Sequence, residues 1–322
     1  MSNEKRDIQE AKKRMKALVA SPTRNEEIAK IINETYDPEM PINEVITSIF
    51  NSGSAEPFED VYYFVPTLPT KEIYVITSSC AVTHSVVSPS SKQTLSFTSA
   101  CTPDYYICLD DLLNGDHNVL DLYGEDIIEA LNRYEIYAVI ALLAAGASAR
   151  GNTFAPDSGD DNLTYLKAYE MKKAIRKYGR KMVLITGTNV TEDVDLMDYN
   201  EDKNRPVSIK DIIDVHIPIE SLDVTVGGVA KDVIDDDKAY LVAVSDSKKN
   251  KPGYFYRRKL GGTMVSAMPD TTIVAKERAI VSTGNMKSTD TTDSFALGVA
   301  GIEQFGAVLT NSYCVAEFDL NG

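Results

Sequence analysis

Tryptophan is absent from this chain of 322 residues, and histidine is scarce. The three histidines, His84, His117 and His216, lie in unrelated segments. A serine or cysteine nucleophile needs a base beside it, most often histidine, and no segment recommends such a pair. We therefore predict that each histidine is a surface or hydrogen-bonded structural residue.

The cysteines are too few and too scattered for a zinc site. Cys80, Cys101, Cys108 and Cys314 form no CxxC pair, and zinc would need a tighter cluster with histidine. We expect free, partly buried thiols in a reducing compartment.

Motifs for nucleotide binding and acyl transfer are also missing. The sequence has no GxxxxGK[ST], no GxGxxG after a strand and no GxSxG. Its nearest imitation of a phosphate-binding turn is Thr186-Gly187-Thr188, which lacks a lysine and a second glycine, so we interpret it as a plain turn. No catalytic or cofactor-binding residue is predicted, no cofactor is implied, and the chain is not expected to be an enzyme.

No metal-binding residue is predicted, although acidic residues gather over 191–202. An EF-hand loop counted from Asp193 needs glycine at its sixth position and glutamate at its twelfth, where the chain has Asp198 and Asn204. Asp235-Asp236-Asp237 is predicted to be a tight turn before a strand, with an ion held between subunits as the open alternative.

Long apolar runs are absent. The longest, 137–147, is shorter than the ~20 residues that span a bilayer. The first 20 residues are charged and have no apolar centre, unlike a signal peptide. We expect a soluble protein that is made in the cytoplasm and has no membrane partner.

Positive charge is in deficit. The chain has 33 basic and 48 acidic residues, a formal net charge of −15, and such a surface repels phosphate backbones and anionic lipid. A sequence-specific nucleic-acid binder is therefore not expected. Residues 1–30 differ, with eight basic against five acidic groups, and we predict a mildly basic arm on an acidic body.

Hydrophobic spacing predicts helices at 4–19 and 23–36, followed by a linker at 37–57 that is rich in turn residues. Residues 59–104 are predicted to form a long hairpin with a small polar tip at 88–91. Its strands are expected at 61–65, 73–77, 81–87, 93–98 and, closing the segment, 105–109.

The clearest helix is predicted at 124–150, with acids in its first turn and one broad apolar face. That face is expected to contain Ile127, Ile128, Leu131, Tyr134, Ala138, Ala141, Leu142 and Ala145. A second helix is predicted at 162–178, with Leu166 and Tyr169 among its apolar positions, and a single helical turn at 209–213. Further strands are expected at 182–185, 215–219, 239–244, 253–257, 272–275, 278–282, 306–309 and 313–320.

This order of elements resembles the major capsid proteins of tailed bacteriophages, which have an α+β, HK-ninety-seven-like fold that encapsulins share. The most specific stretches are 208–219 with 237–242, and 303–318. The resemblance implies five parts: an N-terminal arm and linker at 1–58, an extended β-hairpin loop at 59–104, a peripheral domain with its spine helix at 105–179, an axial domain at 180–300, and closing strands of the peripheral domain at 301–322.

The resemblance implies a structural subunit that assembles with itself into hexamers and pentamers of an icosahedral shell around the phage genome. Scaffolding, portal and decoration proteins are the implied partners, and packaged DNA would be touched without sequence specificity. Assembly in the bacterial host cytoplasm and residence in the virion capsid follow. The arm begins almost at Met1, which implies a separate scaffolding protein or none. Lys92 lies near the presumed hairpin tip, but no asparagine partner for a covalent cross-link is identified.

Three alternatives stay open from the sequence: an encapsulin-type compartment shell, a tail-tube or adaptor protein of a virion, and a cytosolic α/β enzyme with an unrecognised site. The hairpin favours the shell. Some 45 residues of hairpin cannot bury two faces on their own chain, and their strand edges stay open unless they lie on a neighbour.

Overall fold

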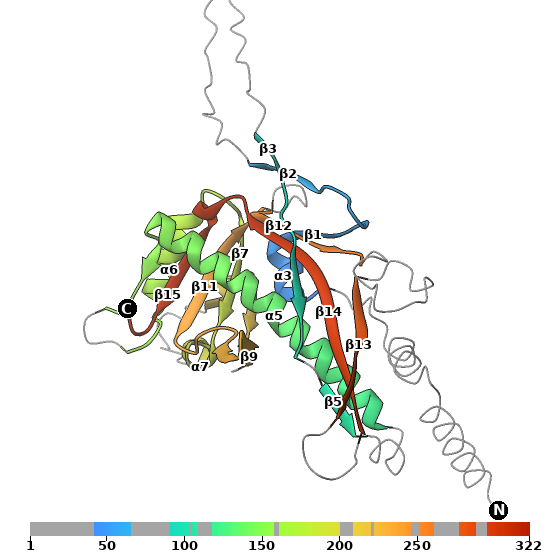
Figure 1. Cartoon of the computed structure of the whole chain (residues 1–322). Coiled ribbons are helices and arrows are strands. Elements are labelled where there is room, and N and C mark those ends of the chain that lie inside the picture. The colour runs from blue at the N-terminus through green and yellow to red at the C-terminus, as the bar shows by residue number, and fades with distance from the viewer. Residues whose placement is uncertain are drawn as a thin grey trace, which may run out of the picture.

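The computed structural model describes residues 42–65, 91–103, 105–108, 118–157, 161–199, 209–219, 222–245, 251–260, 277–287 and 295–322. Within these ranges the chain forms two large sheets, one long helix that packs along both, and two small two-stranded sheets (Figure 1).

The six-stranded sheet is built around the longest described strand, β14 (Phe295–Leu309). Antiparallel partners of β14 are β12 (Gly253–Arg258), β13 (Arg278–Lys287), β4 (Thr98–Cys101) and β5 (Tyr105–Cys108). A further strand, β1 (Phe50–Ala55), pairs with β12 in parallel. The short helix α3 (Glu44–Ile49) precedes β1, and the Asn43 side chain caps it by accepting a hydrogen bond from Val45 N at 2.8 Å.

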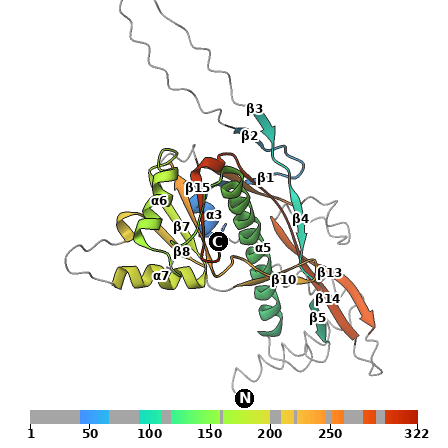
Figure 2. The same ribbon diagram turned by 90° about the vertical axis from the view of Figure 1, so that its left-hand side faces the viewer.

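The five-stranded sheet has the order β6 (Thr153–Phe154), β15 (Val315–Asp319), β11 (Lys238–Val244), β7 (Lys181–Thr186), β8 (Val215–Pro218). Its central strands β11 and β7 are almost continuously buried, as their unbroken apolar runs predict. The helices α6 (Tyr165–Ile175) and α7 (Thr188–Tyr199) pack against it on the side away from the six-stranded sheet (Figure 2). Two single turns, η1 (Ile209–Asp211) and η3 (Ser312–Cys314), lead into β8 and β15.

The long helix α5 (Asn118–Arg150) confirms the helix predicted at 124–150 and begins earlier. Its 33 residues give a length of about 50 Å. It packs against β14 and also against β15 and η3. Two glycines allow this close approach, because a Cβ on Gly301 would collide with Ile127 and one on Gly146 with Leu309.

The buried face of α5 turns along the helix. Its buried positions are Gly124, Ile127, Ile128, Leu131, Glu135, Ile136, Val139, Ile140, Leu143, Gly146 and Ala147. At 3.6 residues per turn, the step from Ile127 to Gly146 rotates this broad face by roughly 100°. The helix can therefore present one side to β14 and another to β15.

The predicted apolar face of this helix is wrong in its C-terminal half. Ala141 and Ala145 are exposed, whereas Leu143 and Ala147 are fully buried. A straight face assumes a single partner, and α5 has two sheets as partners. On α6, Leu166 and Tyr169 were also expected to be apolar contacts, yet they are 69% and 45% exposed.

The linker predicted at 37–57 is wrong for its described part. Residues 44–55 form α3 and β1, and Ile46, Ile49 and Phe50 are completely buried. The glycine in this segment was interpreted as a turn residue, but Gly53 lies within β1. It faces the ring of Tyr256 in the neighbouring strand, where a Cβ would be too close.

The chain also divides between the sheets differently from the predicted boundaries. The strands β12 and β13, expected in a domain at 180–300, pair with β14 in the six-stranded sheet. Conversely, β15 leaves β14 after η3 and pairs with β11, and α6 packs on that same five-stranded sheet. Apolar content marks such strands in a sequence, but it does not show which sheet they join.

Two small sheets complete the fold. The strands β9 (Asp223–Val226) and β10 (Val229–Asp232), which the sequence analysis missed, form a hairpin whose turn residues Gly227 and Gly228 have φ of 61° and 81°. Both positive angles suit the tight turn between twisted strands. The strands β2 (Tyr62–Val65) and β3 (Ser91–Thr94) pair antiparallel and form the described base of the predicted hairpin.

Several expected elements lie outside the described residues: the helices at 4–19 and 23–36, the strands at 73–77, 81–87 and 272–275, and residues 88–90 of the hairpin tip. The placement of Ser91 and Lys92 at or near the tip is wrong, because both lie in β3 at the hairpin base, opposite Val65 and Phe64. No described helix is long and apolar enough to cross a membrane.

The corrected face of α5 gives a matched pair of variants. Ala147→Arg should destabilise the subunit by several kcal/mol, because it places an unpaired charge at a fully buried position. Ala141→Arg, on the exposed side, should change stability by only about 0.5 kcal/mol or less. Urea unfolding followed by circular dichroism measures both, and equal effects would show that the assigned face is incorrect.

Candidate functional site

The histidines, cysteines and acidic segments that the sequence analysis considered lie in separate elements where the structure describes them. On β8, His216 has its Nε2 at 2.8 Å from the Thr186 hydroxyl of β7, so it is a hydrogen-bonded residue between two strands. The other two histidines lie outside the described residues. Of the described cysteines, Cys101 is exposed, and Cys314 is a thiol whose pKa burial raises to about 12.

The acidic segments have structural contacts. Asp193 lies in α7, accepts a hydrogen bond from Leu163 N at 2.8 Å, and has a pKa raised mainly by burial. The Asp235–Asp237 turn precedes β11 as predicted, and the Asp237 carboxylate accepts hydrogen bonds from Asn189 and Asn321, each at 2.6 Å. Among the described residues no group of three or more acidic, histidine or cysteine side chains is arranged to hold a metal ion.

The turn at Gly187 packs closely against the segment that precedes β11. A Cβ at this position would meet the backbone of Asp235 and Asp236, which fill the space beside the turn. The prediction of a plain turn between β7 and α7 is confirmed.

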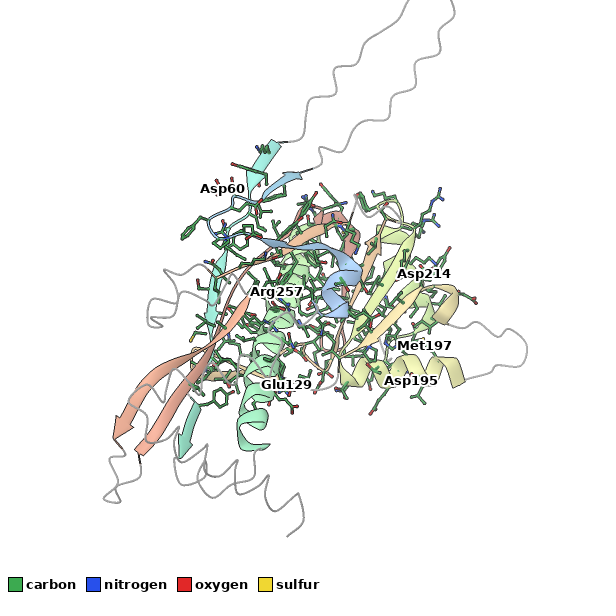
Figure 3. All side chains as sticks on the ribbon, turned by 90° about the vertical axis from the view of Figure 1, so that its right-hand side faces the viewer. Asp60, Glu129, Asp195, Met197, Asp214 and Arg257 are labelled. Atoms are coloured by element: carbon green, nitrogen blue, oxygen red, sulfur yellow. The ribbon has the colours of Figure 1, made fainter. Side chains whose placement is uncertain are left out.

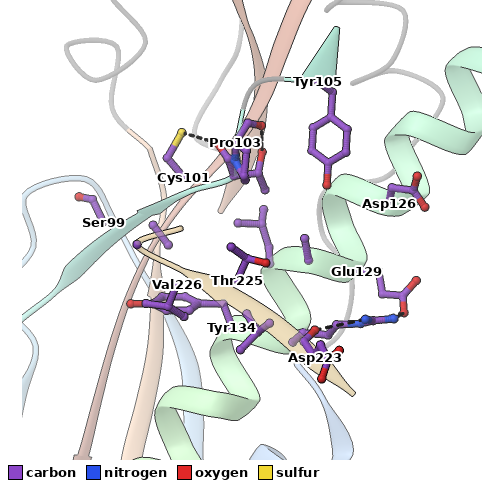
Figure 4. A pocket seen from close by; sticks show the side chains of 17 residues that line it. Ser99, Cys101, Pro103, Tyr105, Asp126, Glu129, Tyr134, Asp223, Thr225 and Val226 are labelled. Atoms are coloured by element: carbon purple, nitrogen blue, oxygen red, sulfur yellow. Dashed lines mark hydrogen bonds and ion pairs between the residues drawn. The ribbon is translucent and has the colours of Figure 1, made fainter. Parts of the chain in front are cut away.

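A groove of about 500 Å³ lies between α5, the segment of β4 and β5, and the β9–β10 hairpin (Figure 4). Its apolar lining includes Ala100, Ala130, Leu131, Tyr134, Val224 and Val226. Arg133 crosses it: the guanidinium is paired with Glu129 on α5 and donates to the carbonyl of Asp223 on β9 at 3.3 Å. The Arg133 side chain thus links α5 to β9 across the groove.

The residues that line the groove include the carboxylates of Asp126, Glu129 and Asp223 but no histidine. The thiol of Cys101 donates to the carbonyl of Thr102 at 3.2 Å, and the pKa of Tyr105 is raised by burial and then by Asp126. A phenol with a raised pKa is even less ionised at neutral pH than usual.

A buried ionic cluster lies where α5 meets the six-stranded sheet, and Figure 3 labels one of its members, Arg257. Arg257 on β12 donates to both carboxylate oxygens of Glu135 on α5, at 2.7 and 2.8 Å. Arg278 on β13 donates to Glu303 on β14 at 2.6 Å and to the Asn132 side chain of α5 at 2.7 Å. All four charged side chains are 0–2% exposed.

Two further contacts complete the cluster. Arg278 Nη2 lies 3.1 Å from a carboxylate oxygen of Glu135, and the partly exposed Glu277 lies 3.6 Å from Arg257. One helix is thereby joined to three adjacent strands. The sequence analysis missed this cluster, although Glu135 stands at an inward position of the helix and Arg257 at an inward position of β12, whose residues alternate between buried and half-buried.

The cluster has more carboxylates than cations, and Glu303 shows the consequence. Burial first, and then the charge of Glu135, raise the pKa of Glu303 to about 8 despite Arg278 beside it. One of its oxygens, Oε1, is buried without a hydrogen-bond partner. A proton on Glu303 reduces this excess of negative charge in the cluster.

The base of the hairpin is a separate surface. The strands β2 and β3 pair only with each other among the described residues, and the Tyr63 hydroxyl donates to Gln93 at 2.7 Å across them. Beyond β3 the chain buries Leu95 and then enters β4, which pairs with β14. The hairpin is therefore connected directly to the central strand of the six-stranded sheet.

No family model matches the sequence, and no curated protein does. Solved structures are similar to it. A structure from Microbacterium phage Oxtober96 is 13% identical, covers 88% of this chain and 93% of its own, and gives a TM-score of 0.54. One from Mycobacterium phage Bobi is 14% identical, covers 93% and 98%, and gives a TM-score of 0.52. The capsid structure of Cyanophage P-SCSP1u is 10% identical, covers 84% and 86%, and gives 0.48.

The chain has the HK-ninety-seven-like fold. This confirms the predicted α+β class and the resemblance drawn from the order of elements. The helix α5 covers the residues 124–150 that were predicted to form a long helix, and β2 and β3 form the base of the predicted hairpin.

The bidentate pair of Arg257 and Glu135 predicts that a single substitution lowers the free energy of unfolding more than a double substitution does. Arg257→Met should lower the free energy of unfolding by about 3–5 kcal/mol, because Glu135 loses its two strongest hydrogen bonds inside the core. Adding Glu135→Leu should recover most of the loss, since the buried Glu135 carboxylate is then gone and Arg278 keeps its hydrogen bond to Glu303. Urea titration of the unassembled subunit tests this, and a single variant within 1 kcal/mol of the parent would contradict it.

Glu303 predicts a pH dependence of stability. Between the ordinary carboxyl pKa of 4.5 and about 8, the native state binds more protons than the unfolded chain, so stability should fall as pH rises through this window. Glu303→Gln has no titrating proton and should flatten that part of the profile. Denaturant midpoints from pH 5 to 9 measure it, and superimposable profiles for the two proteins would refute the assignment.

Proposed function

We propose that this protein is a shell-forming structural subunit, the major capsid protein of a tailed bacteriophage, and not an enzyme. The observation that carries the proposal is the likeness in fold to two phage structures over 88% and 93% of the chain. The candidate site is then a set of contact surfaces, which agrees with the groove and the hairpin base described above.

The hairpin supports an assembling subunit. A two-stranded sheet is marginal by itself, and β2 and β3 have no further strand partner among the described residues. Its outer edges offer unpaired backbone groups to another chain. We propose that the loop at 59–104 lies on a neighbouring subunit, and that the six-stranded sheet with α5 is the peripheral domain and the five-stranded sheet the axial domain.

The charge of the chain fits a shell around nucleic acid. A net charge of −15 weakens attachment to a phosphate backbone, so packaged DNA is contacted without specificity. The partners are further copies of the chain in hexamers and pentamers, together with scaffolding, portal and decoration proteins. The subunit is made and assembled in the host cytoplasm and resides in the virion.

Negative-stain electron microscopy of the purified protein tests the proposal. Closed shells, or hexamers and pentamers, are the expected particles at neutral pH. Tubes would indicate a tail protein instead, and a monomer that persists over a wide range of salt and concentration would refute the shell. Shells that enclose an enzyme in place of DNA in the native cell would indicate an encapsulin-type compartment.

Shortening the loop tests its role. Replacing residues 66–90 by a short Gly-Ser turn keeps β2, β3 and every described contact of the body, and loop closure changes by only ~0.6 kcal/mol per doubling of length. The shortened chain should melt cooperatively but form no closed shell. Loss of the circular dichroism signal would instead assign the loop to its own core, and normal shells would place the lattice contacts elsewhere.

A further inference from the structure

One turn at the base of the hairpin holds an aromatic residue in a left-handed conformation. Residues 56–59 connect β1 to β2, and Glu59 N donates to the carbonyl of Glu56 at 3.1 Å. Within this turn Phe58 has φ of 63°, and it is the one residue other than glycine with a positive φ in the described part of the chain. Glycine or asparagine normally occupies such a position after proline, because a side chain there costs free energy.

Side chains from two segments hold this turn in place. The Glu59 carboxylate accepts from Glu56 N at 2.9 Å, and Lys259 donates to the Glu56 carboxylate at 2.6 Å. Arg258 donates to the carbonyl of Glu59 at 2.6 Å. These contacts fix the conformation, and strained backbone persists where its surroundings over-determine it, most often at sites of function.

The strained turn presents its aromatic ring to solvent. Phe58 is 77% exposed, the most exposed of the large apolar residues in the described chain, and Tyr62, the first residue of β2, is 46% exposed. Lys92 lies 3.6 Å above the Tyr62 ring, and Arg258 lies 3.8 Å above the ring of Phe97. Figure 3 shows Asp60, in the same connection, at the edge of the body beside β2 and β3. Exposed aromatic rings with arginine are the composition of interface hot spots.

We propose that Phe58 is an anchor residue that docks on a second copy of this chain. The inference rests on the proposed shell function and names a contact within it. Within the described part of the chain the ring lies outside the buried core and forms no aromatic pair, so a partner would explain why it is displayed at the cost of backbone strain. Because the turn leads directly into β2, a contact made here continues into one made by the hairpin.

Area and charge both favour another copy as the partner. An aromatic side chain buries about 150–250 Å², against roughly 800 Å² that each partner contributes to a stable interface. Phe58 alone therefore buries too little area to hold two subunits together, and free subunits stay soluble. It contributes to a stable interface only when the hairpin also docks. Charge around the patch balances, so it attracts neither polyanions nor anionic lipid. The three carboxylates are Glu56, Glu59 and Asp60, and the three cations are Lys92, Arg258 and Lys259.

The test compares Phe58→Gly with Phe58→Ala. Glycine removes the ring and accepts the positive φ, so the melting temperature of the unassembled subunit should stay equal or rise by up to about 4 °C. Alanine removes the ring without this relief and should melt below the glycine variant. Both should raise the protein concentration needed for assembly by about tenfold or more. A residue that served only its own fold would not lose assembly while keeping or gaining stability.

A photoreactive benzoylphenylalanine at position 58 identifies the partner. Covalent dimers of the chain after irradiation of assembled particles are expected, and cross-links confined to one chain, or to a different protein, would overturn the inference. If the parent protein forms no shells, the proposed function fails. If the parent assembles and both variants assemble at the same concentration, only the role of Phe58 fails.

Discussion

The bidentate contact between Arg257 and Glu135 is the interaction on which the rest of the body depends. It occurs where a 33-residue helix must sit on a sheet whose strands come from distant parts of the sequence. Apolar packing alone would tolerate sliding of the helix, since one methyl group replaces another at little cost. A buried charge tolerates much less, because any shift leaves it without a partner. The cluster thus sets the position of α5 along β12, β13 and β14, and α5 in turn positions the second sheet through β15.

Much of the fold could be predicted because local patterns were strong. The unbroken apolar runs at 182–185 and 239–244 are β7 and β11, the central strands of the five-stranded sheet. The existence of α5 followed from its acids and periodic apolar residues. Its buried face did not, because that face depends on two sheets that only the folded chain brings together. Residues 44–55 were mistaken for a linker for a similar reason: Phe50 is buried by residues far away in sequence, opposite Gly253 in β12.

The contact surfaces were harder to predict than the elements. Arg278 and Glu303 lie 25 residues apart and meet only through the register of β13 with β14. The left-handed conformation of Phe58 could not be predicted either, since the sign of φ cannot be read from residue type. Sequence order nevertheless pointed to the HK-ninety-seven-like fold, because the succession of hairpin, long helix and paired strands is retained where identity to similar structures is only 13–14%.

The pairing of β14 has a mechanical consequence. The strand β4, which comes from the hairpin, lies antiparallel along residues 302–305 of β14, while β12 pairs with residues 305–309. A pull on the hairpin along its strands is directed along β4, so the hydrogen bonds between β4 and β14 are stressed together in shear instead of opening one after another. The same force reaches β12 through the continuous backbone of β14, because β12 pairs with the next residues of that strand. A subunit held to its neighbours by the hairpin would therefore resist tension in the plane of a shell more strongly than a force that peels the strand away.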